Sequence, residues 1–347
     1  MTMSAITHDF ANWMQTLPEV VQKRRINHIA IPGTHDSQSY TIDFQNPLGP
    51  GLVFSLANLA ARVSTTVATI IEAWTLTQSA SVYDQLTQGC RSFDFRVSYD
   101  HSSDTFYFTH TFTCIPLETA LNDLKLFLET HPGEVVIIQM KPGYFDRHSM
   151  PPSHNDLAVQ KVEDTLGPLL CPCTPKCRFD ETMSLENMVK RNERAILYYQ
   201  GDLAEQYSFV WDDTHLNDPW DDTSNLEQKL DELSADLEGF EVSEENLNMI
   251  SFTLTPQQKE VIQDIFSRFL KRGYKGEGVF SLAKEMHAAI PEFWKQHHVE
   301  IKKATIFKTN FPTPEFVKYI ISANSPATLA EHQNFSKDDM PNSAKED

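Results

Sequence analysis

The sequence predicts a single α/β domain built as a barrel, on three observations. Short apolar stretches alternate with segments of helical periodicity over roughly 300 residues, which is the pattern of repeated strand–helix units. The stretch Val135–Met140 is almost wholly apolar, as is typical of a parallel strand buried on both faces. No segment of contrasting composition divides the chain. We therefore expect one sheet of parallel strands closed into a barrel, rather than separate domains.

The predicted barrel spans residues 26–323. A helical lead-in over residues 1–25 is expected to cover one end of the core, and residues 324–347 are expected to form a polar, flexible tail. Strand-like runs occupy residues 26–31, 92–97, 105–112, 135–140, 195–199, 247–254 and 304–310. Apolar residues at helical spacing mark residues 52–76, 81–86, 117–128, 157–166, 257–270 and 315–321.

The acidic stretch 212–245 is predicted to contain a helix at the surface. Leucines recur there at helical spacing from Leu226 to Leu237. Ser224 and Glu227 have the spacing of a capping box, in which each side chain satisfies a backbone N–H of the first turn. The many carboxylates indicate that one face of this helix is solvated.

Composition limits the functions that the chain can have. With 40% hydrophobic residues in 347, it can bury a large core. The formal charge of −19 disfavours nucleic acid and tight electrostatic docking on anionic membranes. Five cysteines do not make a disulfide scaffold in a chain of this length, and residues 1–13 lack the basic and apolar segments of a signal peptide. These features predict a reducing, cytoplasmic location, and they say nothing about oligomeric state.

Two local stretches have features of other functions. Cys171, Cys173 and Cys177 lack the paired spacing of a zinc site and are expected to be loop thiols. The apolar stretch Leu52–Leu76 is interrupted by charges, so it is too polar to span a membrane. We expect an amphipathic helix packed on the domain, with a lipid-contacting, peripheral surface as the functional alternative.

The stretch Ile31–Ser37 has the order of residues that a catalytic loop needs. The strand-like run is expected to stop at Pro32-Gly33, and a histidine, a carboxylate and hydroxyls follow at once. Such residues at the carboxyl end of a strand suit proton transfer, because the strand holds them rigidly. The alternative is an ordinary turn whose polar residues only cap a helix.

Other strands end in reactive side chains as well. Asp94 and Arg96 share one face of their strand, because alternate residues point the same way. Further predicted strands end at His110, Lys141 and Asn310. In an α/β barrel these ends meet at one face, where active sites lie. Each residue alone is more often structural, and the combination is what favours a site.

This set of side chains suits cleavage of a phosphodiester by an internal hydroxyl. One imidazole can take a proton from that hydroxyl, and the other can protonate the leaving oxygen. Arginine can bind two phosphoryl oxygens and offset the charge that builds in the transition state. The chemistry requires no metal and no cofactor.

Four motifs point to a known family. They are Gly33-Thr34-His35-Asp36-Ser37, Gln85-Leu86 with Gly89-Cys90-Arg91-Ser92-Phe93-Asp94-Phe95-Arg96, Phe108-Thr109-His110, and Gln139-Met140-Lys141. In order and spacing the region 28–141 resembles the X-box of phosphatidylinositol-specific phospholipase C, and most closely the small X-domain-containing proteins and the calcium-independent bacterial enzymes. Similarity beyond residue 141 is faint.

The resemblance implies a distorted TIM-type barrel and a role for each matching residue. His35 would be the base for the inositol 2-hydroxyl, and His110 the acid for the diacylglycerol oxygen, with Asp36 orienting it. The products would be diacylglycerol and a cyclic inositol phosphate that can be hydrolysed further. Arg96 and Lys141 stand where the large calcium-dependent enzymes carry acidic ligands, so a metal-free site is implied, with Arg96 in the electrostatic role of calcium. Asp94 and Lys141 would contact the substrate, an inositol phospholipid at a membrane surface.

Two positions depart from the family pattern. Asn310 stands where calcium-independent relatives orient the base with an aspartate, and an amide stabilises an imidazolium less than a carboxylate does. Gln200 stands near a head-group arginine of the bacterial enzymes. These departures keep open a second hypothesis, a weakly active or inactive barrel that binds inositol lipids. A third, a glycerophosphodiester-type hydrolase, would need a cluster of acidic metal ligands, for which only Asp36 and Asp94 are available.

Overall fold

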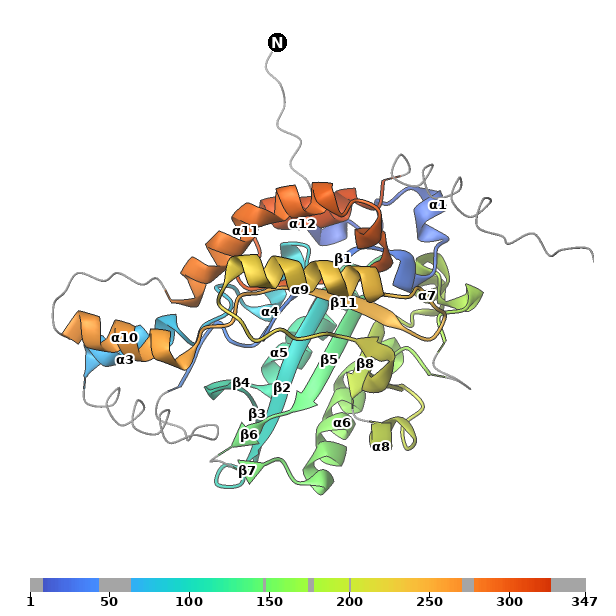
Figure 1. Ribbon diagram of the computed structural model, residues 1–347. Coiled ribbons are helices and arrows are strands. Elements are labelled where there is room, and N and C mark those ends of the chain that lie inside the picture. Colours follow the sequence, from blue (N-terminus) through green and yellow to red (C-terminus); the bar gives the residue numbers. More distant parts are fainter. Residues whose placement is uncertain are drawn as a thin grey trace, which may run out of the picture.

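The computed structural model describes residues 9–43, 64–145, 148–173, 178–199, 201–269 and 278–325. Eight parallel strands form a nearly closed barrel, which confirms the predicted fold class (Figure 1). In order around the barrel they are β10 (Leu216–Asn217), β11 (Leu247–Phe252), β12 (Ile306–Thr309), β1 (Ile31–Thr34), β2 (Ser92–Asp100), β5 (Val136–Pro142), β8 (Ala195–Tyr199) and β9 (Val210–Asp212). Within the described residues, no pairing closes the barrel between β9 and β10.

The remaining strands lie outside the barrel. The hairpin of β3 (Thr105–His110) and β4 (Phe112–Pro116) extends antiparallel from β2. A second, short hairpin joins β6 (Tyr144–Phe145) to β7 (His148–Ser149).

Helices surround the sheet. They are α1 (Glu19–Gln22), α3 (Thr65–Ala73), α4 (Val82–Thr87), α5 (Leu117–Thr130), α6 (Pro152–Leu166), α7 (Leu185–Arg191), α8 (Gly201–Ala204), α9 (Leu226–Gly239), α10 (Gln258–Phe269), α11 (Val279–Gln296) and α12 (Pro314–Ser322). Short 3-10 turns span Phe10–Asn12, Ile26–His28, Gly167–Leu169, Glu181–Met183, Asp213–His215 and Glu300–Lys303. Helices α3 and α10 lie together at one side of the barrel (Figure 1). Among the described residues, no helix is both long and apolar enough to cross a bilayer.

Strand alternation divides the core into two clusters. Ile138 and Met140 of β5 point outward into the layer beneath the helices, whereas Ile137 points into the barrel. Trp13 and Met14 of the lead-in join the inner cluster and are buried. The lead-in is not one continuous helix, because its described part consists of a 3-10 turn and the single turn α1.

A buried ion pair fastens the lead-in to the barrel. Arg91 Nη2 lies 2.9 Å from Glu134 Oε2, and both side chains are fully buried. Glu134 also accepts hydrogen bonds from the backbone N–H groups of Met14 and Gln15, and Arg91 donates to the carbonyl of Ala11. These bonds satisfy both buried charges, as a buried pair requires.

Several element boundaries differ from the sequence prediction. The strand expected over residues 26–31 is β1, Ile31–Thr34, which contains Pro32. Proline is tolerated there because β1 pairs with β2 only from Gly33 onward, and the carbonyl of Pro32 still accepts from Arg91 N. The strand expected over 105–112 is divided by Thr111, which has a positive φ of 62°.

The helix of the acidic stretch, α9, begins one residue later than predicted. Its N-cap is Asn225, which accepts from Gln228 N, and Ser224 instead donates to Glu260. The helix is only partly solvated, because Leu233, Leu237 and Lys229 are buried. The long helix α11 was not predicted.

The prediction of free thiols in the loops is wrong at one cysteine, and several other predictions fall on residues that the structure does not describe. Cys173 forms a disulfide, so the expectation of free loop thiols is wrong at that position, whereas Cys171 is a buried thiol. Gln200, Cys177, residues 52–63 of the predicted helix and the tail beyond residue 325 lie outside the described residues.

Candidate active site

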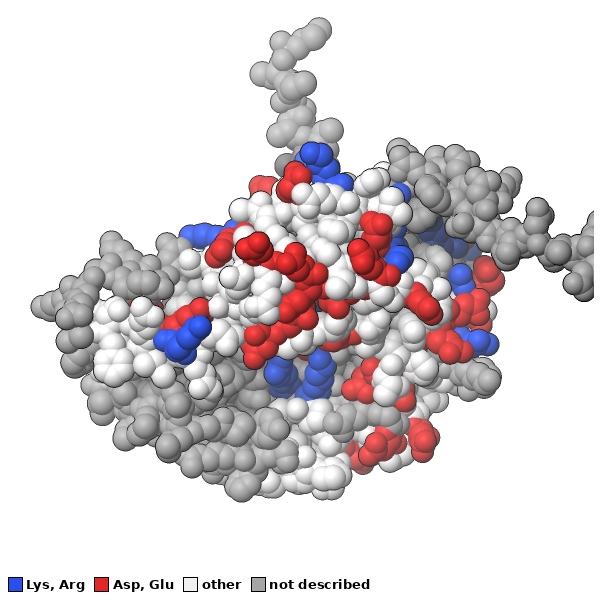
Figure 2. All heavy atoms as spheres, viewed as in Figure 1, with Lys and Arg blue, Asp and Glu red and all other residues white. Residues whose placement is uncertain are grey.

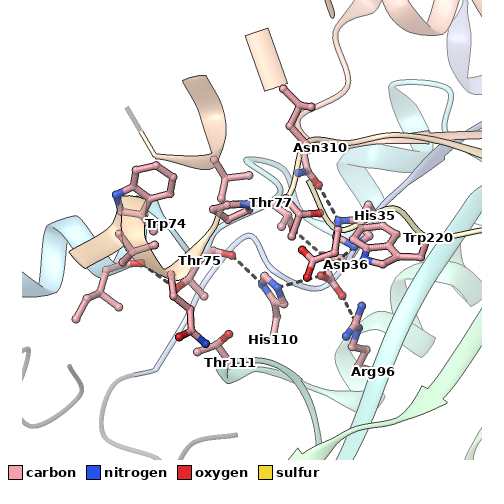
Figure 3. A pocket seen from close by; sticks show the side chains of 18 of the residues that line it. His35, Asp36, Trp74, Thr75, Thr77, Arg96, His110, Thr111, Trp220 and Asn310 are labelled. Atoms are coloured by element: carbon pink, nitrogen blue, oxygen red, sulfur yellow. Dashed lines mark hydrogen bonds and ion pairs between the residues drawn. The ribbon is translucent and has the colours of Figure 1, made fainter. Parts of the chain in front are cut away.

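The carboxyl ends of the barrel strands carry one pocket of about 320 Å³. His35 and Asp36 follow β1, Arg96 lies on β2, His110 ends β3, and Asn310 follows β12. All five side chains line this pocket, and Figure 3 shows them converging from these separate elements. These five residues therefore lie together, as the sequence predicted. Their proximity does not by itself assign a catalytic role to any of them.

Asp36 is the centre of this group. Its Oδ2 lies 3.1 Å from His110 Nε2 and 3.3 Å from His35 Nε2, while its Oδ1 lies 2.8 Å from Arg96 Nε. Burial acts to raise the pKa of the Asp36 carboxyl, but Arg96 and the two histidines outweigh burial and hold that pKa well below its usual value. Asp36 is therefore a fixed negative charge between the two imidazoles.

The backbone turns sharply where the strands that carry the site residues end. Asp36, Thr111 and Phe311 have positive φ angles of 42°, 62° and 48°. The first belongs to the site itself, and the other two directly follow His110 and Asn310. Positive φ costs a residue other than glycine of order 1–3 kcal/mol, and such strain clusters at functional sites.

The segment that follows α3 braces the bends. Gln78 Nε2 donates to the carbonyl of His35 at 2.7 Å, and Thr77 Oγ1 donates to the carbonyl of Asp36 at 2.9 Å. The carbonyl of Thr77 accepts from Phe311 N at 2.9 Å. One segment thus fixes both the β1 loop and the β12 loop.

His35 is held in the tautomer that leaves Nε2 free to accept a proton. Its Nδ1 lies 2.9 Å from the amide oxygen of Asn310 and must donate, because that oxygen can only accept. Burial lowers the pKa of His35, and the attraction of Asp36 does not compensate fully. The imidazole is therefore neutral near pH 7, which is the form that a base requires. Its ring stacks on Trp220 at 4.7 Å between centroids.

His110 lies between a backbone oxygen and a carboxylate. Nδ1 lies 2.9 Å from the carbonyl of Thr75, and Nε2 lies 3.1 Å from Asp36. Both neighbours are acceptors, so only a doubly protonated imidazolium can donate to both. Two histidines that contact one carboxylate have the arrangement that an acid–base pair needs.

A second ionic cluster lies in the barrel mouth beside the pocket. Asp218 accepts from Lys308 at 2.9 Å, from Lys141 at 3.3 Å and from Gln139 at 3.3 Å. Burial would raise the pKa of Asp218, but the two lysines keep it well below its usual value. Lys141 lies level with Arg96 on the neighbouring strand. Figure 2 shows basic side chains gathered beneath a band of acidic ones on one face of the molecule.

Two residues of this region were missed by the sequence analysis. Asp218 and Trp220 fall in the acidic stretch that was assigned to a surface helix, and the barrel strand before them, β10, has only two residues. The sequence Asp218-Pro219-Trp220, an aromatic residue directly after a proline, was the signal that could have indicated a loop here instead of a helix.

Three ligand atoms in the site lie close enough together for a cation. Among the described residues, His35, Asp36 and Asp94 offer atoms within 4.8 Å of one another. However, Arg96 lies 2.8 Å from Asp36, and Lys308 lies 3.8 Å from Asp94. A divalent cation would have to compete with both, so the positive charge of this centre is already supplied by the protein.

The opposite part of the pocket is apolar. Ile71 of α3 and Trp74, which directly follows α3, line it together with Val261 and Ile262 of α10 and Val279 of α11. Trp74 Nε1 donates to Asp264 Oδ2 at 2.8 Å, which joins α3 to α10. Figure 3 shows Trp74 on the far side of His110 from Arg96 and Trp220.

The chain is similar in sequence and in fold to several known proteins. The family described as phosphatidylinositol-specific phospholipase C, X domain, matches residues 63–192. Human PI-PLC X domain-containing protein 2 is 28% identical over 74% of this chain and 81% of its own length, and mouse PI-PLC X domain-containing protein 3 is 28% identical over 74% and 78%. The phosphatidylinositol-specific phospholipase C of Listeria monocytogenes aligns over 91% of this chain and 99% of its own, with a TM-score of 0.59 and 16% identity. A mutant of the Staphylococcus aureus enzyme aligns with a TM-score of 0.61, over 93% of this chain and 99% of its own, at 16% identity.

Proposed function

Because the chain carries a phosphatidylinositol-specific phospholipase C X domain, with PI-PLC X domain-containing proteins as homologues, we propose that it cleaves phosphatidylinositol-type lipids without a metal ion. One observation supports this above all. His35 and His110 contact the same carboxylate oxygen of Asp36, at 3.3 and 3.1 Å, and burial lowers the pKa of His35, which suits it to act as the base.

In the proposed reaction His35 removes the proton of the inositol 2-hydroxyl through Nε2. The resulting oxygen attacks phosphorus, the bond from phosphorus to the diacylglycerol oxygen breaks, and His110 transfers its proton to that oxygen. The products are diacylglycerol and a cyclic inositol phosphate. Each proton transfer is worth about 10²–10⁴-fold in rate.

Arg96 is the group best placed to bind the phosphoryl oxygens. Asp36 engages Nε of its guanidinium, and the side chain is 41% exposed, so part of it faces the pocket. Arginine donates along two parallel bonds to a phosphate and stabilises charge that develops in the transition state. Lys141 and Asp94 are proposed to contact the head group, and Asn310 to position His35.

The substrate would be met at a membrane surface through apolar contacts. Phe266 of α10 and Phe280 of α11 are 63% and 44% exposed near the pocket. The net charge of −19 opposes attraction to anionic lipid. Binding to phosphatidylcholine vesicles should therefore fall in Phe266→Ser and Phe280→Ser and should change little between low and high salt, as a sedimentation assay would show. Binding abolished by salt would contradict an apolar docking surface.

One observation favours a second candidate, a lipid-binding protein with little turnover. Asn310 gives His35 a neutral partner at 2.9 Å, whereas a carboxylate would stabilise the imidazolium that forms during proton abstraction. The fold would then present the head-group pocket without an effective base.

Incubation of the purified protein with labelled phosphatidylinositol vesicles tests the proposal. Wild-type protein should release cyclic inositol phosphate, and His35→Ala and His110→Ala should each lose activity by about 10²–10⁴-fold. His101→Ala is the matched control, because His101 is exposed and outside the pocket. Binding without turnover would favour the second candidate. Chelator-sensitive release of a glycerol phosphate would indicate a glycerophosphodiester-type hydrolase instead.

A further inference from the structure

The pocket is divided into a charged end and an apolar arm. The charged end holds both histidines, Asp36 and Arg96. The apolar arm is walled by Ile71, Trp74, Val261, Ile262 and Val279. Ile71 and Val279 are buried, at 4% and 2% exposure, and Trp74 is held by its bond to Asp264. The arm is thus a built surface that is continuous with the catalytic groups, rather than a chance gap at the edge of the protein.

The arm begins on the side of His110. His110 Nδ1 bonds the carbonyl of Thr75, and Thr75 directly follows Trp74 in the chain. Arg96 and Trp220 lie on the other side of His110 (Figure 3). In the proposed reaction His110 protonates the leaving oxygen, so the substituent on that oxygen extends from His110 toward the arm, away from the head group.

The chemistry of the arm excludes a charged occupant. Among the described residues that line the pocket, Arg96 is the one lysine or arginine, and it belongs to the charged end. The other charged residue outside the catalytic group is Asp222, a carboxylate. A second phosphate in the arm would meet no lysine or arginine, whereas methylene groups would contact isoleucine, valine and tryptophan side chains.

The geometry points to an acyl-chain subsite: we infer that the arm binds the first methylenes of one alkyl chain on the leaving alcohol of the phosphodiester. This inference rests on the proposed function, and it adds that the substrate is recognised at both ends of the scissile bond. The pocket volume of about 320 Å³ is at the low end of ligand sites, which span ~300–1,000 Å³, so a single chain segment fits better than two whole chains.

A series of water-soluble inositol 1-phosphate esters tests the inference without a membrane. The probes are the methyl, butyl and octyl esters, with matching non-hydrolysable phosphonates for binding, all used below their micellar concentrations. In wild-type protein the Kd of the phosphonates should fall about fourfold per methylene, equivalent to about 0.8 kcal/mol per buried CH₂, until the arm is full.

Variants assign the effect to the arm. Val261→Trp fills it, so the advantage of the octyl over the methyl probe should disappear while the Kd of the methyl probe is unchanged. Ile262→Ser, at a position that is 37% exposed, should reduce the gain per methylene without affecting folding. Leu126→Ser on α5 is the matched control, because Leu126 is 50% exposed and does not line the pocket.

The two proposals fail in different ways. Turnover of the methyl ester with a Kd that does not depend on chain length overturns the acyl-chain subsite and leaves the phosphodiesterase intact. Chain-dependent Kd without turnover of any ester supports the subsite and contradicts the proposed activity. A chain-length dependence that persists in Val261→Trp overturns the assignment to this arm, and a dependence seen only on vesicles assigns it to a membrane surface instead.

Discussion

Asn310 is the residue at which a single change should improve the catalytic base. Its amide oxygen lies 2.9 Å from His35 Nδ1, and the side chain is 3% exposed. In Asn310→Asp a carboxylate takes the place of that amide. Two unit charges 4 Å apart attract by about 4 kcal/mol at an effective dielectric constant of about 20. Desolvation of the new carboxylate offsets part of this attraction, because the site is buried.

The net effect should be a rise of about 1–3 units in the pKa of His35, the usual range for an opposite charge at this distance. In the wild-type protein that pKa is lowered by burial, so the base form persists below the ordinary value of about 6.5. In the variant the imidazole should remain protonated to higher pH. The acidic limb of the pH–rate profile should therefore shift to higher pH. Above the new pKa of His35 the rate should exceed that of the wild-type protein.

Two measurements check this result. The pH dependence of kcat/KM gives the pKa of the base in the free enzyme, and NMR titration gives that of His35 directly. Asn192→Asp is the matched control, because Asn192 is exposed and lies before the amino end of β8, away from the pocket. An acidic limb that does not move in a folded Asn310→Asp protein would refute His35 as the base.

Three further variants separate structural charges from catalytic ones. Glu134→Gln leaves Arg91 buried without its counter-ion and should lower the free energy of unfolding by about 3–5 kcal/mol, with kcat/KM of the folded protein unchanged; a loss in kcat/KM would contradict a purely structural pair. Asp218→Asn should lower the free energy of unfolding by removing the nearer of the two counter-ions of buried Lys308, and the added change Lys308→Met should restore most of the loss in urea unfolding. Because the pKa of Asp218 is lowered on folding, its contribution is present above its ordinary pKa of about 3.9 and is lost as the pH falls below it. Arg96→Lys should reduce kcat by about 10²–10³-fold with little loss of stability, and an unchanged kcat would exclude Arg96 from stabilising the transition state.

The sequence predicted the parts of the fold that strong periodicity encodes. The apolar run Val135–Met140 corresponds to β5, and the helical spacing after Pro116 corresponds to α5. His35 and Arg96 could be placed together because parallel strands end at one face of a barrel. That inference used topology alone and did not need exact strand boundaries. For His110 the expected reason was wrong, because His110 ends β3, an antiparallel strand outside the barrel that pairs with β2.

What could not be predicted depends on contacts that are distant in the sequence. β10 has two residues, too few for a periodic signal, so Asp218 and Trp220 were assigned to a surface helix. Lys308 appeared to be an ordinary polar residue in a strand, and only the barrel brings Asp218 within 2.9 Å of it. The apolar arm is likewise formed by α3 and α10. These helices are far apart in the sequence, so no local pattern predicts their contact.

The central claim is that protein cations, and not a bound metal, supply the positive charge of this site. The most direct test measures cyclic inositol phosphate released from phosphatidylinositol vesicles by wild-type protein, with and without a calcium chelator. Because Arg96, at 2.8 Å from Asp36, supplies the positive charge in the proposed site, we expect the same rate in both conditions. A rate abolished by the chelator and restored by added calcium would contradict the claim.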